Sequence, residues 1–192
     1  MHKPLAFLDT ETTGLDPVEH EIIEIGIIRR DIDGNCFRFH SLIKPEHIET
    51  AHPKALAVNG YAKNPSLWDS APSLKEKAPE IAQILEGCIL VGHNVSFDEG
   101  MLKGNFKNIG IDLRIPHRKI DTITLVFEHL FPLGLRDASL DGVRKFLNWS
   151  KEDAHTAMKD SEDVMHLYDL LNGAGLFIQL WIRLKRLLGI EV

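Results

Sequence analysis

Two carboxylates near the N-terminus stand where the sequence predicts a buried strand. Asp9 and Glu11 belong to the run of residues 5–14, LAFLDTETTG. Side chains alternate along a strand, so both acids point to one face, roughly 7 Å apart. Like charges at this distance raise each other's pKa and remain ionised where a cation lies between them. The pair indicates a divalent metal site, although an isolated Asp-x-Glu more often ends a strand in water.

Three further side chains are candidates for the same site. Asp98 follows residues 88–91, CILV, which predict a central parallel strand, and ligands bind at the carboxyl ends of such strands. A partner for the helix dipole would also explain this aspartate. His155 and Asp160 are five residues apart, about 140° around an ideal helix. They converge on one site only if His155 lies in the loop or first turn before the helix; otherwise both are ordinary surface residues.

The elements that carry these residues alternate between strand and helix after an antiparallel start. Strands are expected at the Asp9 segment, at residues 20–30 and 37–43 around an Asp33-Gly34 hairpin turn, at 88–91 and at 119–122. A capping box of Ser73 and Glu76 predicts a helix to about residue 86, after a long connection with a short helix at 54–58. A further helix is expected to open within residues 92–98 and to run to about residue 106, and others are expected at 123–129, 139–147 and 153–171. This order predicts an α/β protein with a mixed five-stranded sheet flanked by helices.

Composition restricts the class of protein. The 192 residues, 44% hydrophobic and 26% charged, suit one globular domain with a sizeable core. We expect a cytoplasmic protein, since there are two cysteines, no secretory signal pattern and no apolar segment of ~20 residues. A net charge of -6 disfavours a duplex-binding protein, but two divalent ions would change it to -2. The charge therefore leaves a nucleic-acid partner open.

Taken together, the candidate residues form a more specific pattern. Asp9-x-Glu11, residues 92–98 (GHNVSFD) and His155-x-Ala157-x-x-Asp160 resemble, in order and separation, the three motifs of the DnaQ-like, DEDDh class of 3′-to-5′ exonucleases. The resemblance covers about residues 4–171 and includes IIEIG at 22–26 and Asp121-Thr122. It implies an RNase H-like domain over residues 1–172. The family includes the proofreading subunit of bacterial replicative DNA polymerase and, on the RNA side, RNase T and oligoribonuclease.

The resemblance also assigns roles to residues. Asp9 would bridge two Mg²⁺ or Mn²⁺ ions, Glu11 and Asp160 would complete one ion site, and Asp98 would hold the second ion. Hard oxygen ligands suit these metals. Histidine titrates near neutral pH, so His155 would be the general base. The implied substrate contacts are Thr10, Thr12, Leu15, Asn59, Asn94 and Phe97, with Leu15 wedged against the last base.

We therefore expect a metal-dependent 3′-to-5′ exonuclease that releases nucleoside monophosphates from single-stranded DNA ends, in proofreading or repair. One alternative is an exoribonuclease of the RNase T or oligoribonuclease type. Another is a module whose main role is to bind a nucleic-acid end or a replication partner, with incidental hydrolysis of the nucleic acid. Fold alone does not separate these functions.

Residues 173–192 fall outside the family core and predict an amphipathic helix. The helix is expected to pack on the domain or on a second copy in a homodimer. Residues 179–184, QLWIRL, also resemble the short peptides with which replication proteins bind the sliding clamp. A basic amphipathic helix can also bind a polymerase subunit or a membrane surface. Its expected apolar face is Phe177, Leu180, Trp181, Leu184, Leu187 and Leu188, opposite Gln179, Arg183, Lys185 and Arg186.

Overall fold

A mixed five-stranded sheet forms the centre of the computed structural model, which describes residues 3–115, 117–172 and 176–190. The strand order is β3-β2-β1-β4-β5. β1 (Leu5–Thr12), β2 (Ile22–Arg30) and β3 (Cys36–Leu42) form an antiparallel meander. β4 (Ile89–Gly92) pairs in parallel with β1, and β5 (Lys119–Asp121) pairs in parallel with β4. The predicted fold class is thus confirmed.

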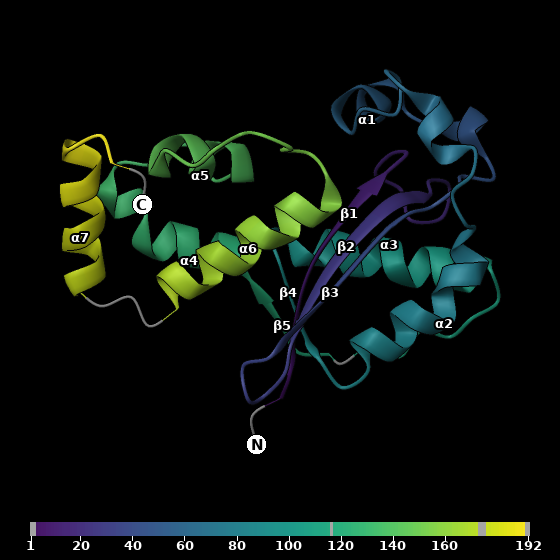
Figure 1. The fold of residues 1–192 in the computed structure, drawn as a ribbon, viewed down its shortest axis with the longest axis horizontal. Helices are drawn as coiled ribbons and strands as arrows, with labels where there is room; N and C mark the ends of the chain where they lie inside the picture. The colour runs from purple at the N-terminus through teal and green to yellow at the C-terminus, as the bar shows by residue number, and fades with distance from the viewer. Residues whose placement is uncertain (1–2, 116, 173–175, 191–192) are drawn as a thin grey trace.

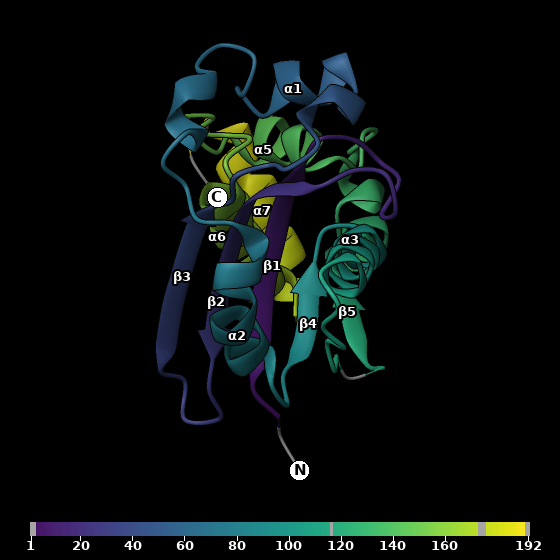
Figure 2. The same cartoon turned by 90° about the vertical axis from the view of Figure 1, so that its right-hand side faces the viewer.

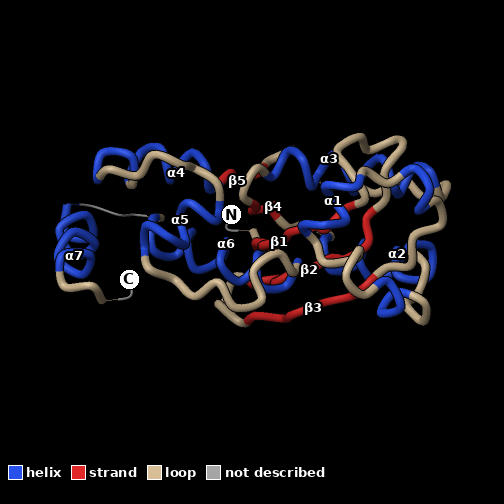
Figure 3. The backbone as a smooth tube through the Cα atoms, turned by 90° about the horizontal axis from the view of Figure 1, so that it is seen from above, coloured by secondary structure: helices blue, strands red, loops and turns tan. Residues whose placement is uncertain are grey.

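Helices cover both faces of the sheet (Figure 1). One face carries α2 (Leu74–Leu85) and α3 (Val95–Asn108), and the other carries α6 (Ala157–Leu171), with α4 (Thr122–His129) and α5 (Leu140–Leu147) beyond it. α1 (Pro53–Val58) lies above the end of the sheet to which β1 points (Figure 2). α7 (Leu176–Leu187) stands at the far end of the molecule, past α4 and α5 (Figure 3). The described residues also contain short 3₁₀ helices at Ile48–Thr50, Pro65–Trp68 and Phe131–Leu133.

Alternation along β1 divides the core into two clusters and directs the acids. Ala6 and Leu8 belong to the cluster shared with α2 and α3, whereas Phe7 belongs to the cluster shared with α4, α5 and α6. By the period of two, Asp9 and Glu11 continue the Phe7 face, toward α6. The intervening Thr10 points toward α3.

Two predicted boundaries differ from the structure. The hairpin turn forms, with Gly34 at φ 88°, but the connection spans residues 31–35, longer than the two-residue turn expected. α6 begins at Ala157 and not at Asp153, which is held at φ 58°. Ser150 and Asp153 have the spacing of a capping box, but the Ser150 hydroxyl accepts a hydrogen bond from the Glu152 backbone amide at 3.1 Å, in a local turn ahead of the helix. The predicted capping box of α2 does form.

α7 contacts the domain through a residue outside the predicted apolar face. Ile182 is fully buried in the cluster that contains Val126 and Leu171. The residues expected to pack are exposed, namely Leu180, Trp181, Leu184, Leu187 and Leu188, while the side chains of Phe177, Gln179 and Arg186 lie outside the described residues. Within the described part of the chain, no helix has the length and apolar character that a bilayer span requires.

Candidate active site

The structure brings three of the four predicted metal ligands together. Asp9 and Glu11 come from β1, and Asp160 comes from the first turn of α6. One carboxylate oxygen from each lies within 4.8 Å of the others. Asp160 is 149 residues or more from the two strand acids in sequence, so the packing of α6 on the sheet builds the cluster.

Close approach between β2 and the start of α6 makes this packing possible. Gly26 pairs with Asp9 across the ladder, and a Cβ on Gly26 would lie 2.3 Å from the Ala157 carbonyl oxygen. The Ser161 hydroxyl donates to the Gly26 carbonyl at 3.0 Å. The Ala157 amide donates to Glu24 Oε1 at 3.1 Å, which gives this buried glutamate a helix N-terminus as its partner.

Asp98 comes from the first turn of α3 and is outside the group of three. Its side chain is 3% exposed, and its Oδ1 accepts hydrogen bonds from the Thr10 amide at 3.0 Å and the Thr10 hydroxyl at 2.8 Å. Thr10, expected to contact substrate, therefore uses both donors to orient Asp98. The two oxygens of Asp98 differ in environment, because Oδ1 is occupied by this threonine.

Burial and mutual repulsion raise the pKa values of the clustered acids. Burial is the largest cause at each, followed at Asp9 by the charge of Asp98 and at Glu11 by that of Asp160. The pKa of Glu11 rises to about 9 and that of Asp98 to about 7, while that of Asp9 rises well above its usual range. Burial also raises the pKa of Asp160, against the lowering effect of Arg144. A divalent cation would stabilise the ionised form of these buried, mutually repelling carboxylates and could take their oxygens as ligands.

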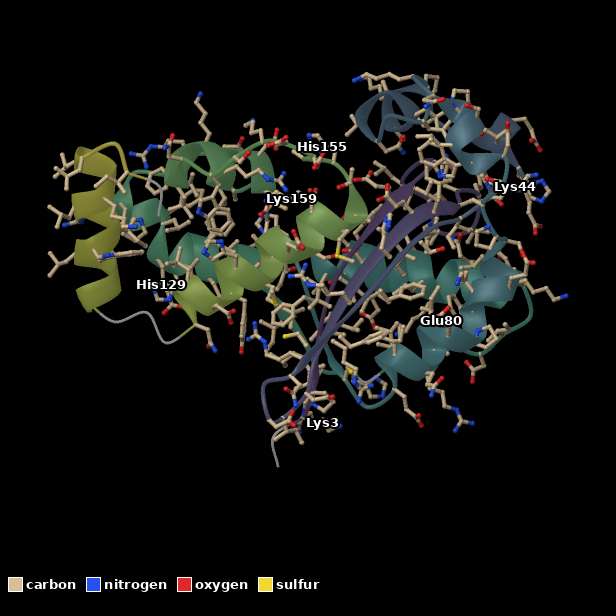
Figure 4. All side chains as sticks on the ribbon, viewed as in Figure 1. Lys3, Lys44, Glu80, His129, His155 and Lys159 are labelled. Carbon is tan, nitrogen blue, oxygen red and sulfur yellow. The ribbon has the colours of Figure 1, made fainter. Side chains whose placement is uncertain are left out.

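His155 lies in the loop before α6, the position that convergence with Asp160 required (Figure 4). Its backbone is left-handed, with φ 66°. The His155 amide donates to Asp160 Oδ1 at 3.2 Å, and the ring Nε2 is 3.6 Å from Asp141 Oδ2. The side chain is 42% exposed, so the imidazole is accessible to a water or a substrate.

A groove of 530 Å³ lies beside the acids. Among the residues predicted to contact substrate, Thr10, Thr12, Leu15 and Phe97 line it, together with Glu11. Leu15 is 81% exposed, which leaves its side chain available to a ligand. Residues of α1, including Ala55 and Val58, form another wall.

The structure places Asn59 and Asn94 in supporting positions. Asn59 is buried, and its Nδ2 donates to the Thr12 carbonyl at 3.0 Å, which ties the α1 segment to the end of β1. Asn94 adopts φ 73° before α3, and its backbone amide donates to Asp121 Oδ1 at 3.1 Å. The Asn94 side chain is exposed. Of the two, only Asn94 presents its side chain to solvent.

Arg144 is a site residue that the sequence analysis did not identify. It is fully buried in α5 and donates to Asp160, Asp163 and Asp141. A signal was present in the sequence, because this arginine interrupts an apolar stripe at helical spacing with Leu140, Val143 and Leu147. A charge on such a stripe requires a buried partner of opposite sign.

Comparison with known proteins agrees with the geometry. A family described as "Exonuclease" matches residues 6–168. The chain belongs to this DnaQ-like exonuclease family. The DNA polymerase III subunit epsilon of Escherichia coli is 33% identical over 178 residues, which cover 86% of this chain and 70% of that protein. The PolC-type DNA polymerase III of Thermotoga maritima is 35% identical over 155 residues, 80% of this chain but 11% of that protein.

The fold is also that of known exonuclease structures. A structure of exonuclease I superimposes with a TM-score of 0.76 at 20% identity, covering 96% of this chain and 44% of that one. The predicted RNase H-like fold and the membership in the DnaQ-like exonuclease family are both confirmed.

Proposed function

We propose that this member of the DnaQ-like exonuclease family is a metal-dependent 3′-to-5′ exonuclease of the DEDDh class, which releases nucleoside monophosphates from single-stranded DNA. The observation that carries the proposal is the group of Asp9, Glu11 and Asp160 oxygens within 4.8 Å, beside a groove with apolar walls. A terminal nucleotide in the groove would bring its phosphate to the acids. We propose the DEDDh class because a histidine, His155, lies in the loop before α6 and five residues ahead of Asp160.

The acids would hold two Mg²⁺ or Mn²⁺ ions, since all their donor atoms are hard oxygens. Asp9, Glu11 and Asp160 would form one site, and Asp98 with Asp9 the other. Bound divalent ions supply Lewis acidity for in-line displacement at phosphorus. The neutral imidazole of His155 would accept the proton of the attacking water as the water oxygen bonds to phosphorus. The bond from phosphorus to the 3′-oxygen breaks, and this oxygen takes up a proton from solvent, which leaves a 5′-monophosphate and a new 3′ hydroxyl.

The groove supports a single-stranded substrate. Leu15 and Phe97 offer apolar surfaces to a base, and such contacts accept every base with little sequence preference. The names of the relatives are those of DNA polymerases, and one exonuclease I structure is a complex with a dT13 oligonucleotide. These names support DNA over RNA for this chain as well.

The same relatives support action in the cytoplasm beside a DNA polymerase. The exposed residues of α7, Leu184 among them, support the prediction that residues 175–192 bind a polymerase subunit or the sliding clamp. A homodimer and the division of the chain at residue 172 stay predictions.

The proposal is tested with matched 5′-labelled single-stranded DNA and RNA oligomers, in Mg²⁺, Mn²⁺ or EDTA. We expect a ladder of DNA products shortened from the 3′ end with either metal, and intact DNA in EDTA. Asp9→Asn should abolish the ladder, whereas Asp112→Asn, an exposed acid elsewhere, should not change it.

Degradation in EDTA would contradict the proposed mechanism. Faster degradation of RNA would support the exoribonuclease alternative, and binding of intact oligomers without hydrolysis would support a binding module.

A further inference from the structure

The guanidinium of Arg144 connects two helices through three carboxylates. It donates from Nη2 to Asp160 Oδ1 at 2.6 Å, from Nε to Asp163 Oδ2 at 2.7 Å and from Nη1 to Asp141 Oδ1 at 3.1 Å. The arginine side chain is 0% exposed, and those of Asp160 and Asp163 are 10% and 5% exposed. A buried charge is tolerated only when it is paired and hydrogen-bonded. The planar guanidinium, with its fork of N–H donors, meets that condition here.

The two carboxylate oxygens of Asp160 differ in their hydrogen bonds. Oδ1 accepts from Arg144 and also from the His155 amide at 3.2 Å. A carboxylate oxygen has two lone pairs, so these two donors occupy Oδ1. Oδ2 remains for a cation shared with Asp9 and Glu11. The carboxylate is therefore held for binding through one oxygen only.

The arrangement also reaches the loop that carries His155. Asp141, the third partner of Arg144, lies 3.6 Å from His155 Nε2 and also pairs with Lys151 at 3.2 Å. The buried guanidinium of Arg144 thus lies between Asp141, which is beside the predicted base, and Asp160, which belongs to the acid cluster. Helix α5, outside the three family motifs, supplies it.

We propose that Arg144 is a positioning residue, which fixes the Asp160 carboxylate so that Oδ2 is presented to the metal before the metal binds. The inference rests on the proposed function. Without the guanidinium, Asp160 would be ordered only when the ion arrives, and that ordering would weaken metal binding. Arg144 does not line the substrate groove, so the KM for an oligonucleotide should not change at saturating metal.

The test is the double variant Arg144→Met with Asp163→Asn. It removes one positive and one negative charge, so the net charge is preserved. The amide oxygen introduced by Asp163→Asn can still accept from Lys159, which contacts the Asp163 carboxylate at 2.6 Å in the structure. Mn²⁺ binding is measured directly by the electron paramagnetic resonance of free Mn²⁺, alongside kcat and KM. We expect Mn²⁺ to bind about 10–100-fold more weakly, with kcat reduced at subsaturating metal.

The matched control is Arg30→Met with Asp169→Asn. This ion pair, with bonds of 2.7 and 2.6 Å, also joins α6 to a neighbouring element, nine residues from Asp160 along the helix. The same substitutions there should lower the melting temperature and leave Mn²⁺ affinity at the wild-type value. Equal Mn²⁺ affinity in folded Arg144→Met/Asp163→Asn and wild type would overturn the proposal.

A second variant keeps the test independent of folding. Arg144→Lys retains the charge, but an ammonium cannot bridge Asp160 and Asp163 as the fork does. We expect weaker Mn²⁺ binding than in wild type, and wild-type affinity would overturn the inference. If wild type binds Mn²⁺ but degrades no oligonucleotide, the proposed function fails while the comparison of affinities still stands.

Discussion

Gly26 faces Asp9 across the β1–β2 ladder, and the first turn of α6 lies against the bare backbone of Gly26 at Ala157. This contact sets the separation of the two halves of the acid cluster, because Asp9 belongs to the sheet and Asp160 to the helix. A side chain at residue 26 would move the helix away from the sheet. Glycine is required here for close approach, since its φ is not in the left-handed region.

Gly26→Ala should therefore damage the site more than the fold. Displacement of about 1 Å in a reacting arrangement can cost on the order of 100-fold in rate, and we expect a loss of this size with weaker Mn²⁺ binding. The matched control is Gly100→Ala in α3, where an added Cβ meets no atom within 4 Å. That helical substitution should stabilise the protein by about 0.5–1 kcal/mol and leave the rate unchanged. Wild-type metal binding by Gly26→Ala would show that the contact does not set the site.

Local sequence patterns were sufficient to predict most of the fold, whereas the set of candidate acids came from the resemblance of three motifs to a known family. Alternation in β1 predicts that Asp9 and Glu11 share a face, and the structure directs that face to α6. The spacing of His155 and Asp160 predicts a loop position for the histidine, which is observed. These predictions succeed because strand and helix periodicity are local properties.

The remaining features depend on tertiary contacts that local patterns do not contain. The predicted start of α6 was wrong because left-handed residues at 153 and 155 delay the helix. The sequence predicts that Asn59 contacts substrate. In the structure its side-chain amide donates a hydrogen bond to the carbonyl of Thr12, 47 residues away in the chain. Arg144 could be flagged as a charge on an apolar stripe, yet its partners on another helix could not be chosen from the sequence.

His155→Ala should separate metal binding from turnover. The structure uses the backbone amide of His155, not its ring, to hold Asp160, so the alanine variant keeps that hydrogen bond. We expect Mn²⁺ binding near the wild-type value and a rate lower by about 10²–10⁴-fold, the usual contribution of a general base. His47→Ala removes an exposed histidine and serves as the control. An unchanged exonuclease rate in His155→Ala would exclude the ring from catalysis.

Without metal, the free energy of unfolding should fall as the pH rises toward 9. The pKa of Asp98 is raised from 3.8 to about 7 and that of Glu11 from 4.5 to about 9. Between the unfolded and the folded pKa of each acid, the folded protein holds a proton that the unfolded chain has lost. The free energy of unfolding is therefore greatest at the acidic end of that range. It declines as the pH rises, with a slope of about 1.4 kcal/mol per pH unit for each such proton. Urea denaturation in EDTA at several pH values measures this slope.

The same experiment has two internal checks. Glu11→Gln should make the decline above pH 7 shallower, because one of the acids with a raised pKa is removed. Saturating Mn²⁺ should oppose the decline, since deprotonated acids are the ligands. A metal-free protein that gains stability between pH 7 and 9 would contradict the raised pKa values.

Leu15 should bind the terminal base without contributing to stability. Its side chain is 81% exposed beside Phe97 in the groove, so Leu15→Ala removes apolar surface that only a substrate would cover. We expect the KM for single-stranded DNA to rise about fivefold to tenfold, which corresponds to about 1 kcal/mol of lost contact, with Mn²⁺ binding and melting temperature unchanged. Val18→Ala in the same loop, 72% exposed but outside this groove, is the control and should leave KM unchanged. Equal KM values for Leu15→Ala and Val18→Ala would place the terminal nucleotide elsewhere, because a wedge against the last base cannot lose its side chain without weakening the complex.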